Sequence, residues 1–245
     1  MDTMKEDTVK DGMVAVPAVL PATTARAVVA AASPTRVTPR RAKGGSIVWA
    51  VGRHPLSDAR PAAATESRAG AKSRGPAGAG ELAQAGVWAR ALGSVLVARS
   101  ESGVCAILLG DDKALLMAEL ARYFPDATLQ ESAASLADLL ADWWTFLDTP
   151  AQGFNHPLDL AGTPLQQQVW ETLREIPPGA TLTYTDLAAR IGRPQAARAV
   201  ASACAANRLA VVIPCHRVIG RSGSLTGYRW GIDRKRSLLA MEARV

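Results

Sequence analysis

Residues 210–219 read Ala-Val-Val-Ile-Pro-Cys-His-Arg-Val-Ile, an apolar run that leads directly into a thiol and an imidazole. The apolar residues predict a buried, strand-like segment. Pro214 should end that segment, because proline fixes its own φ and lacks a backbone donor. We therefore expect the chain to change direction at Cys215, where a reactive group can be held rigidly and stay reachable. The central question about this chain is what that thiol does beside His216.

Cys215 needs assistance to act as a nucleophile. An unperturbed thiol has a pKa of about 8.5, so only a few per cent of it is thiolate near pH 7. His216 can accept the proton, directly or through one water, if a carboxylate fixes its tautomer. Glu242, in a final helix predicted over 234–243, is the favoured carboxylate. The rivals that the sequence leaves open are Glu171, Glu175, Asp186 and Asp233. A Cys-His dipeptide alone is more typical of a structural core than of an active site.

Composition narrows the class of protein. A chain of 245 residues with 48% hydrophobic residues is typical of one or two packed domains. Three widely spaced cysteines without a CxxC pair exclude a disulfide framework and a cysteine zinc cluster, and three scattered histidines suggest no ligand set. No apolar run approaches the roughly 18 residues of a membrane span. Acidic residues near the N-terminus argue against a secretory signal, so we expect a cytoplasmic protein.

The net charge of +6 is distributed unevenly. Residues 1–80 carry 12 Lys and Arg against 6 Asp and Glu, residues 81–160 carry 4 against 11, and residues 161–245 carry 12 against 5. The block that contains Cys215 is therefore strongly basic. A polyanionic partner, with nucleic acid first, is the natural expectation. A solvated basic face without a partner is the alternative.

The first third of the chain differs from the rest. Residues 1–84 are rich in Ala, Pro, Gly, Thr and Ser and show no lasting period, which predicts a disordered, low-complexity tail. Only residues 46–51 suggest a short strand, and nothing nearby would cover it. Residues 85–160 alternate between β-like and helical patterns and predict a small α/β scaffold. The expected strands are 87–90, 93–98, 103–109 and an edge strand in 157–160, and the expected helices are 111–124 and 132–146.

Residues 161–245 form a helical block. Thr163-Pro164-Leu165-Gln166 is a capping box with proline at the first helical position. Two further helices are expected, one over 184–191, capped by Thr183 with Asp186 three residues on, and one over 195–207. Two short helices joined by a tight Gly-containing turn have the form of a helix-turn-helix. The last of them is rich in alanine and almost without bulky side chains, and Arg198 is the one long side chain near its exposed start. Such a helix either packs closely on a neighbouring helix or approaches DNA.

The motif Pro214-Cys215-His216-Arg217-Val218, with Asn207 upstream, resembles the acceptor site of the O6-alkylguanine-DNA alkyltransferases. The resemblance runs from Val87 to the end and is greatest to the C-terminal methyltransferase part of the family's bacterial adaptive-response members. It includes the segments 166–170, 198–207 and 227–231. It implies an α+β protein, with an RNase H-like α/β domain over 85–160 and a winged-helix-like DNA-binding domain over 161–245.

The resemblance also implies roles for individual residues. Cys215 corresponds to the alkyl acceptor, His216 to the base that acts through water, and Glu242 to the group that orients His216. Asn207 would hold the active-site turn and contact the base.

Three further residues correspond to family positions that contact DNA. Tyr184 would press on the phosphate 3′ of the lesion, Arg198 would fill the gap in the base stack, and Tyr228 would donate to a guanine ring nitrogen. Arg229 and Trp230 follow Tyr228, and their bulk leads us to expect a preference for methyl over benzyl adducts.

The implied activity is DNA repair by a methylated-DNA–protein-cysteine methyltransferase, in which each molecule reacts once. The expected partner is double-stranded DNA carrying O6-alkylguanine, with O4-alkylthymine as a further candidate substrate. We expect a bacterial monomer that uses no metal and no cofactor and contacts no membrane. Residues 1–84 contain no cysteine, so the zinc unit of the adaptive-response members is not expected. The alternatives are a non-catalytic lesion-binding protein and a thiol hydrolase.

Overall fold

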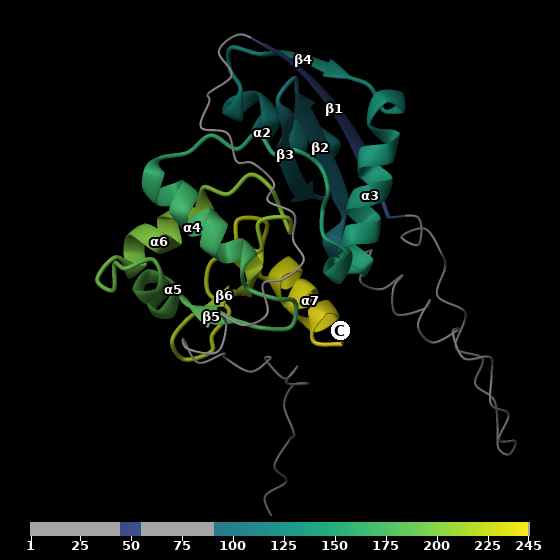
Figure 1. The fold of residues 1–245 in the computed structure, drawn as a ribbon. Coiled ribbons are helices and arrows are strands. Elements are labelled where there is room, and N and C mark those ends of the chain that lie inside the picture. The colour runs from purple at the N-terminus through teal and green to yellow at the C-terminus, as the bar shows by residue number, and fades with distance from the viewer. Residues whose placement is uncertain (1–44, 55–90, 245) are drawn as a thin grey trace, which may run out of the picture.

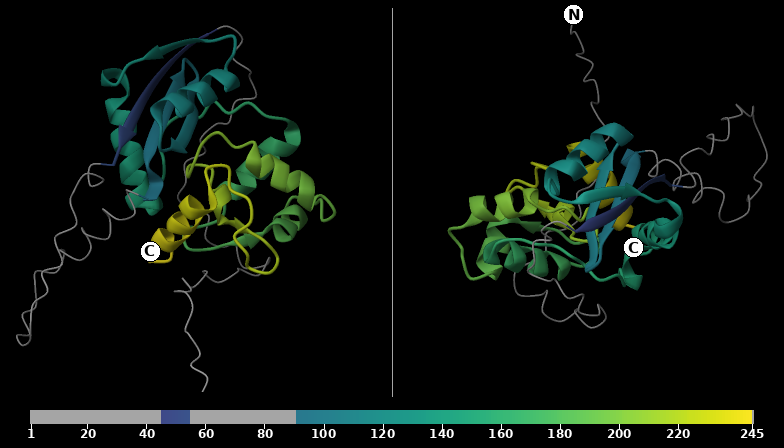
Figure 2. Two further views of the ribbon diagram at one scale, coloured as in Figure 1. Left: turned by 180° about the vertical axis from the view of Figure 1, so that it is seen from behind. Right: turned by 90° about the horizontal axis from the view of Figure 1, so that it is seen from above.

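The computed structural model describes residues 45–54 and 91–244, which form a mixed α+β fold (Figure 1). A four-stranded sheet with its helices makes up what we call the sheet part, residues 45–54 and 91–160. Helices around a two-stranded sheet make up the helical part, residues 161–244. The sheet part occupies the upper half of Figure 1, and Figure 2 shows the same arrangement from behind. The predicted α+β class is confirmed.

The larger sheet has the strand order β3-β2-β1-β4. Strand β2 pairs antiparallel with β1 and β3, whereas β4 pairs parallel with β1. Nearly every residue of β2 and β3 is buried, so both faces of these strands are covered. This explains why their sequences are continuous apolar runs and do not alternate. The strands are β1 Ser46–Arg53, β2 Ser94–Ser100, β3 Gly103–Gly110 and β4 Thr128–Glu131.

The prediction of an unstructured tail through residue 84 is wrong for Ser46–Arg53. This segment is β1, which lies inside the sheet between β2 and β4 and buries Ile47, Trp49 and Ala50. Its partners are remote in sequence, because Val48 pairs with Arg99 in β2 and Ser46 with Thr128 in β4. The strand that covers this segment could therefore not be found among its sequence neighbours. The other residues of the predicted tail lie outside the described residues.

Of the two helices of the sheet part, α2 starts where its local signal places it, whereas α3 starts later than predicted. Helix α2 (Lys113–Tyr123) begins after Asp112, whose side chain accepts from the Leu115 amide. Helix α3 (Ala137–Asp148) follows a short 3-10 turn, Ala134–Leu136, and so begins later than predicted. The predicted edge strand in 157–160 is reduced to a single bridge between Val104 and Leu158. The predicted strand over 87–90 lies outside the described residues.

The helical part follows the predicted order. Both capping boxes are present, at Thr163 with Gln166 and at Thr183 with Asp186. Strands β5 and β6 pair in parallel and were not predicted, because each has only two residues. The elements are α4 Pro164–Arg174, β5 Leu182–Thr183, α5 Tyr184–Arg190, α6 Ala197–Ala205, β6 Val218–Ile219 and α7 Ile232–Glu242.

Helix α6 is the alanine-rich helix, and it is two residues shorter at each end than predicted. One face packs against α4, where the Trp170 indole donates to the Ala203 carbonyl at 2.9 Å. The opposite face is exposed and carries Arg198, Ser202 and Ala205 at helical spacing. The small side chains of α6 thus allow close packing against α4 on one face. On the opposite face they leave a solvent-exposed surface without bulky side chains.

The free edge of β3 connects the sheet part to the segment that leads to Cys215. The Ile107 amide donates to the Arg208 carbonyl at 2.8 Å, and the Ala210 amide donates to the Ile107 carbonyl at 2.9 Å. Backbone hydrogen bonds of this kind satisfy groups that burial would otherwise leave unpaired. The segment that leads to Cys215 is therefore hydrogen-bonded to β3 at the edge of the sheet.

Candidate active site

The turn before Cys215 is tight and strained. Val211 has a φ of 69°, a left-handed conformation that is costly for a β-branched residue. Pro214 follows, and Cys215 then begins a 3-10 turn, η4 (Cys215–Arg217). The change of direction at Cys215 is therefore present as η4. The predicted strand-like run is wrong, because the chain already turns at Val211 and Val212 and leaves only single bridges, Leu209 with Ile107 and Ala210 with Ile213. The thiol is less accessible than expected, because Cys215 is only 4% exposed.

Asn207 holds this turn together from the end of α6. Its side-chain oxygen accepts from the Leu209 amide at 2.8 Å, and its Nδ2 donates to the Ile213 carbonyl at 2.9 Å. Nδ2 also lies 3.3 Å from Cys215 Sγ, as a donor to the sulfur. Asn207 is fully buried, so these contacts replace water entirely. One side chain therefore fixes the turn and stabilises negative charge on the sulfur.

His216 and Glu242 meet in the buried interior. His216 Nε2 lies 2.9 Å from Glu242 Oε1, and Arg217 donates to both carboxylate oxygens, at 2.9 Å from Nε and 2.7 Å from Nη2. Arg217 also donates to the Ile176 carbonyl. The His216 and Arg217 partners hold the pKa of Glu242 down to about 2 against the opposing effect of burial. An ionised Glu242 accepts only, so His216 Nε2 carries the hydrogen and Nδ1 holds a free lone pair.

The charge states of the thiol and the imidazole follow from burial. Desolvation raises the pKa of Cys215 to about 11, although the hydrogen bond from Asn207 and the charge of Lys235 work in the opposite direction. Desolvation also lowers the pKa of His216, with Glu242 opposing. Both groups are therefore neutral near pH 7. His216 Nδ1 is buried without a hydrogen-bond partner in the described structure, which makes it the available proton acceptor.

Lys235 is a buried residue of this region that sequence reasoning missed. It is fully buried on α7, and its Nζ donates to the carbonyls of Val218 and Thr226 at 2.6 and 3.0 Å. Desolvation lowers its pKa to about 8, and the nearby cysteines oppose this shift. A sequence signal existed, because positions 235, 238, 239 and 242 form one buried stripe of α7. A lysine on such a stripe needs buried acceptors.

Tyr228 and Trp230 form what we call the aromatic wall, beside His216. The Tyr228 ring lies edge-on to His216 with centroids 6.4 Å apart, and 5.3 Å from Trp230. The Tyr228 hydroxyl is buried and has no partner in the described structure, and burial raises its pKa well above the usual value. A buried hydroxyl without a partner among the described residues can donate to a group that enters the site. The hydroxyl is thus available to a ligand.

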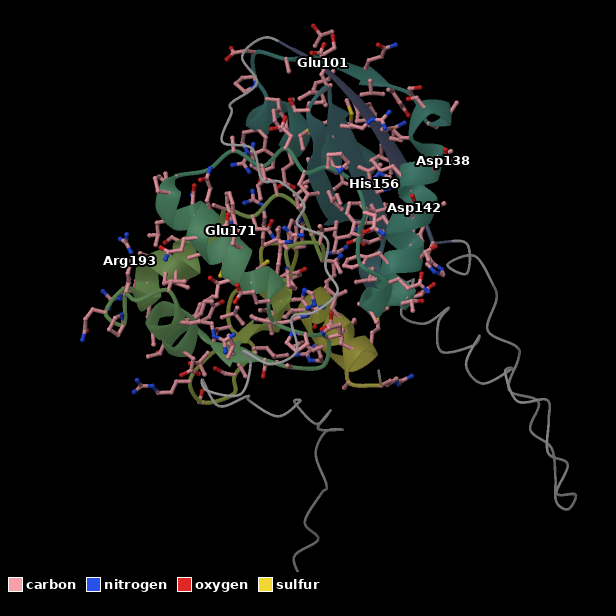
Figure 3. All side chains as sticks on the ribbon, in the orientation of Figure 1. Glu101, Asp138, Asp142, His156, Glu171 and Arg193 are labelled. Carbon is pink, nitrogen blue, oxygen red and sulfur yellow. The ribbon has the colours of Figure 1, made fainter. Side chains whose placement is uncertain are left out.

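The remaining predicted residues lie at the border of this cluster or outside it. Tyr184 begins α5, and its hydroxyl donates to the Thr226 carbonyl at 3.4 Å. Burial raises the pKa of Tyr184 to about 12. Arg198 is exposed near the start of α6 and is not part of the buried cluster. Arg193, at the turn between α5 and α6, also extends outward (Figure 3). Exposed arginines therefore flank the outer face of α6.

The rival carboxylates are placed elsewhere. Glu171 is exposed on α4 (Figure 3), Asp186 caps α5, and Asp233 pairs with Arg236 at 2.6 Å. Glu175 is exposed at the end of α4. Glu242 is therefore the carboxylate that the structure places against His216.

The other cysteines are buried core residues. Desolvation raises the pKa of Cys105 to about 12 and raises that of Cys204 further. Across residues 45–54 and 91–244, no group of three His, Cys, Asp or Glu side chains is arranged to hold a metal ion. Within the same ranges, no helix has the length and apolar character needed to cross a membrane.

Acid should destabilise the fold through this cluster. The pKa of Glu242 is lowered from 4.5 to about 2, so its stabilising effect is present above pH 4.5 and is lost as the pH falls towards 2. The lowered pKa of His216 acts in the same direction below pH 6.5, because the unfolded chain takes up a proton that the buried imidazole resists. We expect the urea midpoint to fall steadily from pH 7 to pH 3. A smaller fall in His216→Ala is expected, and an identical pH dependence in that variant would contradict this account.

The chain is similar to several known proteins. Residues 164–244 match the family model of the 6-O-methylguanine DNA methyltransferase DNA-binding domain. The chain is 51% identical over 152 residues to the bifunctional transcriptional activator/DNA repair enzyme Ada of Escherichia coli K12, covering 62% of this chain and 43% of Ada. It is 43% identical over 121 residues to the inducible methylated-DNA–protein-cysteine methyltransferase of Bacillus subtilis 168, covering 49% of this chain and 68% of that protein.

A solved structure titled as Mycobacterium tuberculosis OGT in complex with DNA aligns at 35% identity with a TM-score of 0.49, covering 63% of this chain and 89% of that one. The chain spans less than half of the length of Ada. Two thirds of the Bacillus subtilis protein is nevertheless matched at 43% identity. The chain belongs to the 6-O-methylguanine DNA methyltransferase family.

Proposed function

We propose that this protein repairs DNA by transferring the methyl group of O6-methylguanine irreversibly to Cys215. The observation that carries the proposal is the arrangement of Asn207, Cys215, His216 and Glu242, in which a buried thiol held by Asn207 directly precedes a histidine whose tautomer is fixed by an ionised carboxylate. The names of the relatives support DNA repair and methyl transfer to cysteine. The basic charge of residues 161–245 supports DNA as the partner.

The methyl carbon of such a lesion lies inside the duplex, so the nucleotide must rotate out to reach a thiol that is itself buried. Extrusion costs a few kcal/mol and costs least at a damaged pair. We propose that α5 and α6 act as a helix-turn-helix within a winged-helix-like domain, and that the sheet part is an RNase H-like domain. The open, small-residue face of α6 would then lie against DNA, with Arg198 filling the stack and Tyr184 pressing on the 3′ phosphate.

The chemistry follows from the charge states of the site. The Cys215 thiol gives its proton to His216 Nδ1, directly or through one water, and Glu242 stabilises the imidazolium that forms. The sulfur then attacks the methyl carbon in line, so that an S–C bond forms while the C–O6 bond breaks and its electron pair passes to the guanine. A hydrogen bond from Tyr228 to a ring nitrogen stabilises that anion, which regains a proton. The thioether has no easy leaving group, so each molecule reacts once.

Transfer of label decides between this function and its rivals. A duplex oligonucleotide with radiolabelled O6-methylguanine should place one methyl group on each protein molecule, with no second turnover. Tight binding without transfer would show a lesion-binding protein. Repeated turnover of a small ester would show a thiol hydrolase. A second oligonucleotide with O4-methylthymine tests that further substrate, and sedimentation of the complex tests the proposed monomer.

Arg198→Ala should impair repair of duplex DNA selectively. If Arg198 fills the gap left by the rotated nucleotide, its loss should slow single-turnover repair about tenfold, since extrusion costs a few kcal/mol. Reaction with O6-methylguanine as a free base should be unchanged. Arg193→Ala is the matched control, because it removes the same charge from the neighbouring exposed turn. Equal losses on both substrates would exclude the stack-filling role.

A further inference from the structure

The loop that carries the aromatic wall is attached on two sides. Residues 220–231 connect β6 to α7, and Lys235 holds the first side, because its Nζ donates to the Thr226 and Gly227 carbonyls at 3.0 and 3.4 Å. The second side is Arg229, which lies between Tyr228 and Trp230 and reaches into the sheet part. Lys235 does not reach the end of the loop that carries the wall, because its acceptors in the loop are Thr226 and Gly227. The Arg229 contacts therefore help to hold that end in place.

Arg229 joins three elements with one guanidinium group. Its Nε and Nη2 donate to Glu119 Oε1 on α2, at 3.0 and 2.9 Å. Its Nη1 donates to the carbonyl of Ala205, the last residue of α6, at 2.6 Å. The planar, rigid guanidinium is suited to holding several acceptors in fixed directions. The loop, the alanine-rich helix and the sheet part are thereby connected at one point.

The contact to Glu119 is reinforced by Tyr123. The Tyr123 hydroxyl donates to Glu119 Oε1 at 2.9 Å, and the Arg229 guanidinium lies 4.9 Å from the centroid of the Tyr123 ring. The Arg229 and Glu119 side chains are only 20% and 24% exposed. Charge-assisted hydrogen bonds in such a shielded position are stronger than an open surface pair. This pair is therefore a defined contact between the two parts.

A second arginine supports the same loop. Arg234 donates from Nη1 to the Trp230 carbonyl at 2.9 Å and from Nε to the Leu92 carbonyl at 2.9 Å. Its Nη2 donates to Asp111 Oδ1, next to α2, at 2.6 Å. Both ends of the wall are thus connected to acidic residues of the sheet part. In both pairs a basic residue of the helical part meets an acidic residue of the sheet part.

We propose that the Glu119–Arg229 pair is a brace between the two parts that fixes the aromatic wall and so limits the size of the alkyl group that Cys215 can accept. Glu119 and Arg229 are positioning residues, since they act through Tyr228 and Trp230. A close-packed interior admits a larger group only if a wall moves. Releasing the brace therefore favours a benzyl adduct over a methyl adduct. The inference rests on the proposed methyl transfer.

The test compares rates of transfer to Cys215 from duplex oligonucleotides that carry O6-methylguanine or O6-benzylguanine. Glu119→Gln and Arg229→Gln should each raise the benzyl-to-methyl ratio of single-turnover rate constants about fivefold, a change expected from losing one partly shielded ion pair. The double variant should show the ratio of Arg229→Gln alone, because the charge removed from Glu119 acts on the wall through Arg229. If Arg229→Gln does not fold, Glu119→Gln still tests the brace, since it leaves the contact to Ala205 in place.

Arg236→Gln and Asp233→Asn are the matched controls. They remove the same charges from an exposed pair on α7 that joins no two parts of the protein. Their ratios should equal that of the wild type. A wild-type ratio in both brace variants, or an equal increase in the controls, would overturn the brace while leaving methyl transfer established. A wild-type protein that transfers no methyl group would overturn the proposed function itself, and the brace with it.

Discussion

Cys215→Ala is expected to abolish methyl transfer completely and to leave binding to lesion-containing duplex DNA intact. The proposed reaction ends with a bond from carbon to the sulfur of this residue, and no neighbouring group replaces a thiolate as nucleophile. Alanine removes only the sulfur from a site that is 4% exposed, so the fold should be retained. Label transfer measures the reaction, and gel retardation measures DNA binding.

The two other cysteines provide the controls for this prediction. Burial raises the pKa of Cys105 to about 12 and that of Cys204 further, and both lie in the packed core. Cys105→Ala and Cys204→Ala should therefore keep one methyl group transferred per molecule. Mass spectrometry of the reacted wild-type protein should place the added methyl group on the peptide that contains Cys215. Residual methyl transfer in Cys215→Ala would show that another residue is the acceptor.

His216→Ala should slow transfer by about a hundredfold at neutral pH, the usual contribution of a positioned general base. Arg217 still pairs with Glu242 in this variant, so the buried carboxylate keeps a charged partner and the fold should survive. His156→Ala is the matched control. His156 lies near Asp142 in the sheet part (Figure 3), with 2.8 Å between Nε2 and Oδ2, and its loss should leave the rate unchanged.

The pH profile separates loss of a base from general damage to the site. The pKa of His216 is lowered from 6.5, so the wild-type imidazole stays neutral and able to accept a proton throughout pH 6.5 to 9. The wild-type rate should be flat from pH 6.5 to about pH 7.5, below the pKa of about 8 of Lys235, whose charge favours the thiolate. Without His216 the rate should rise about tenfold per pH unit, because the thiolate fraction of a thiol with a pKa of about 11 rises in that proportion. A flat profile in His216→Ala would contradict the role of His216 as the base.

Much of the helical part could be predicted from the sequence because its signals are local. The capping boxes at Thr163 and Thr183 define helix starts through contacts three residues apart, and the structure has both. Pro214 likewise predicts the change of direction at Cys215 from its own ring geometry. The motif around Cys215 and its resemblance to the alkyltransferases indicated the family directly. Glu242 could only be favoured among five carboxylates, since the sequence contains no measure of its distance from His216.

Three features were decided only by the tertiary structure. Strand β1 joins the sheet through partners that lie far along the chain, on β2 and β4. Lys235 is buried because three main-chain carbonyls surround its ammonium group, and Arg229 reaches a carboxylate on α2. The sequence alone established where helices begin, which residue carries the sulfur and which family the chain resembles, because these depend on neighbouring residues and short motifs. The shape and electrostatics of the site around Cys215 depend on packing between distant segments, and no local sequence pattern contains the free energy of that packing.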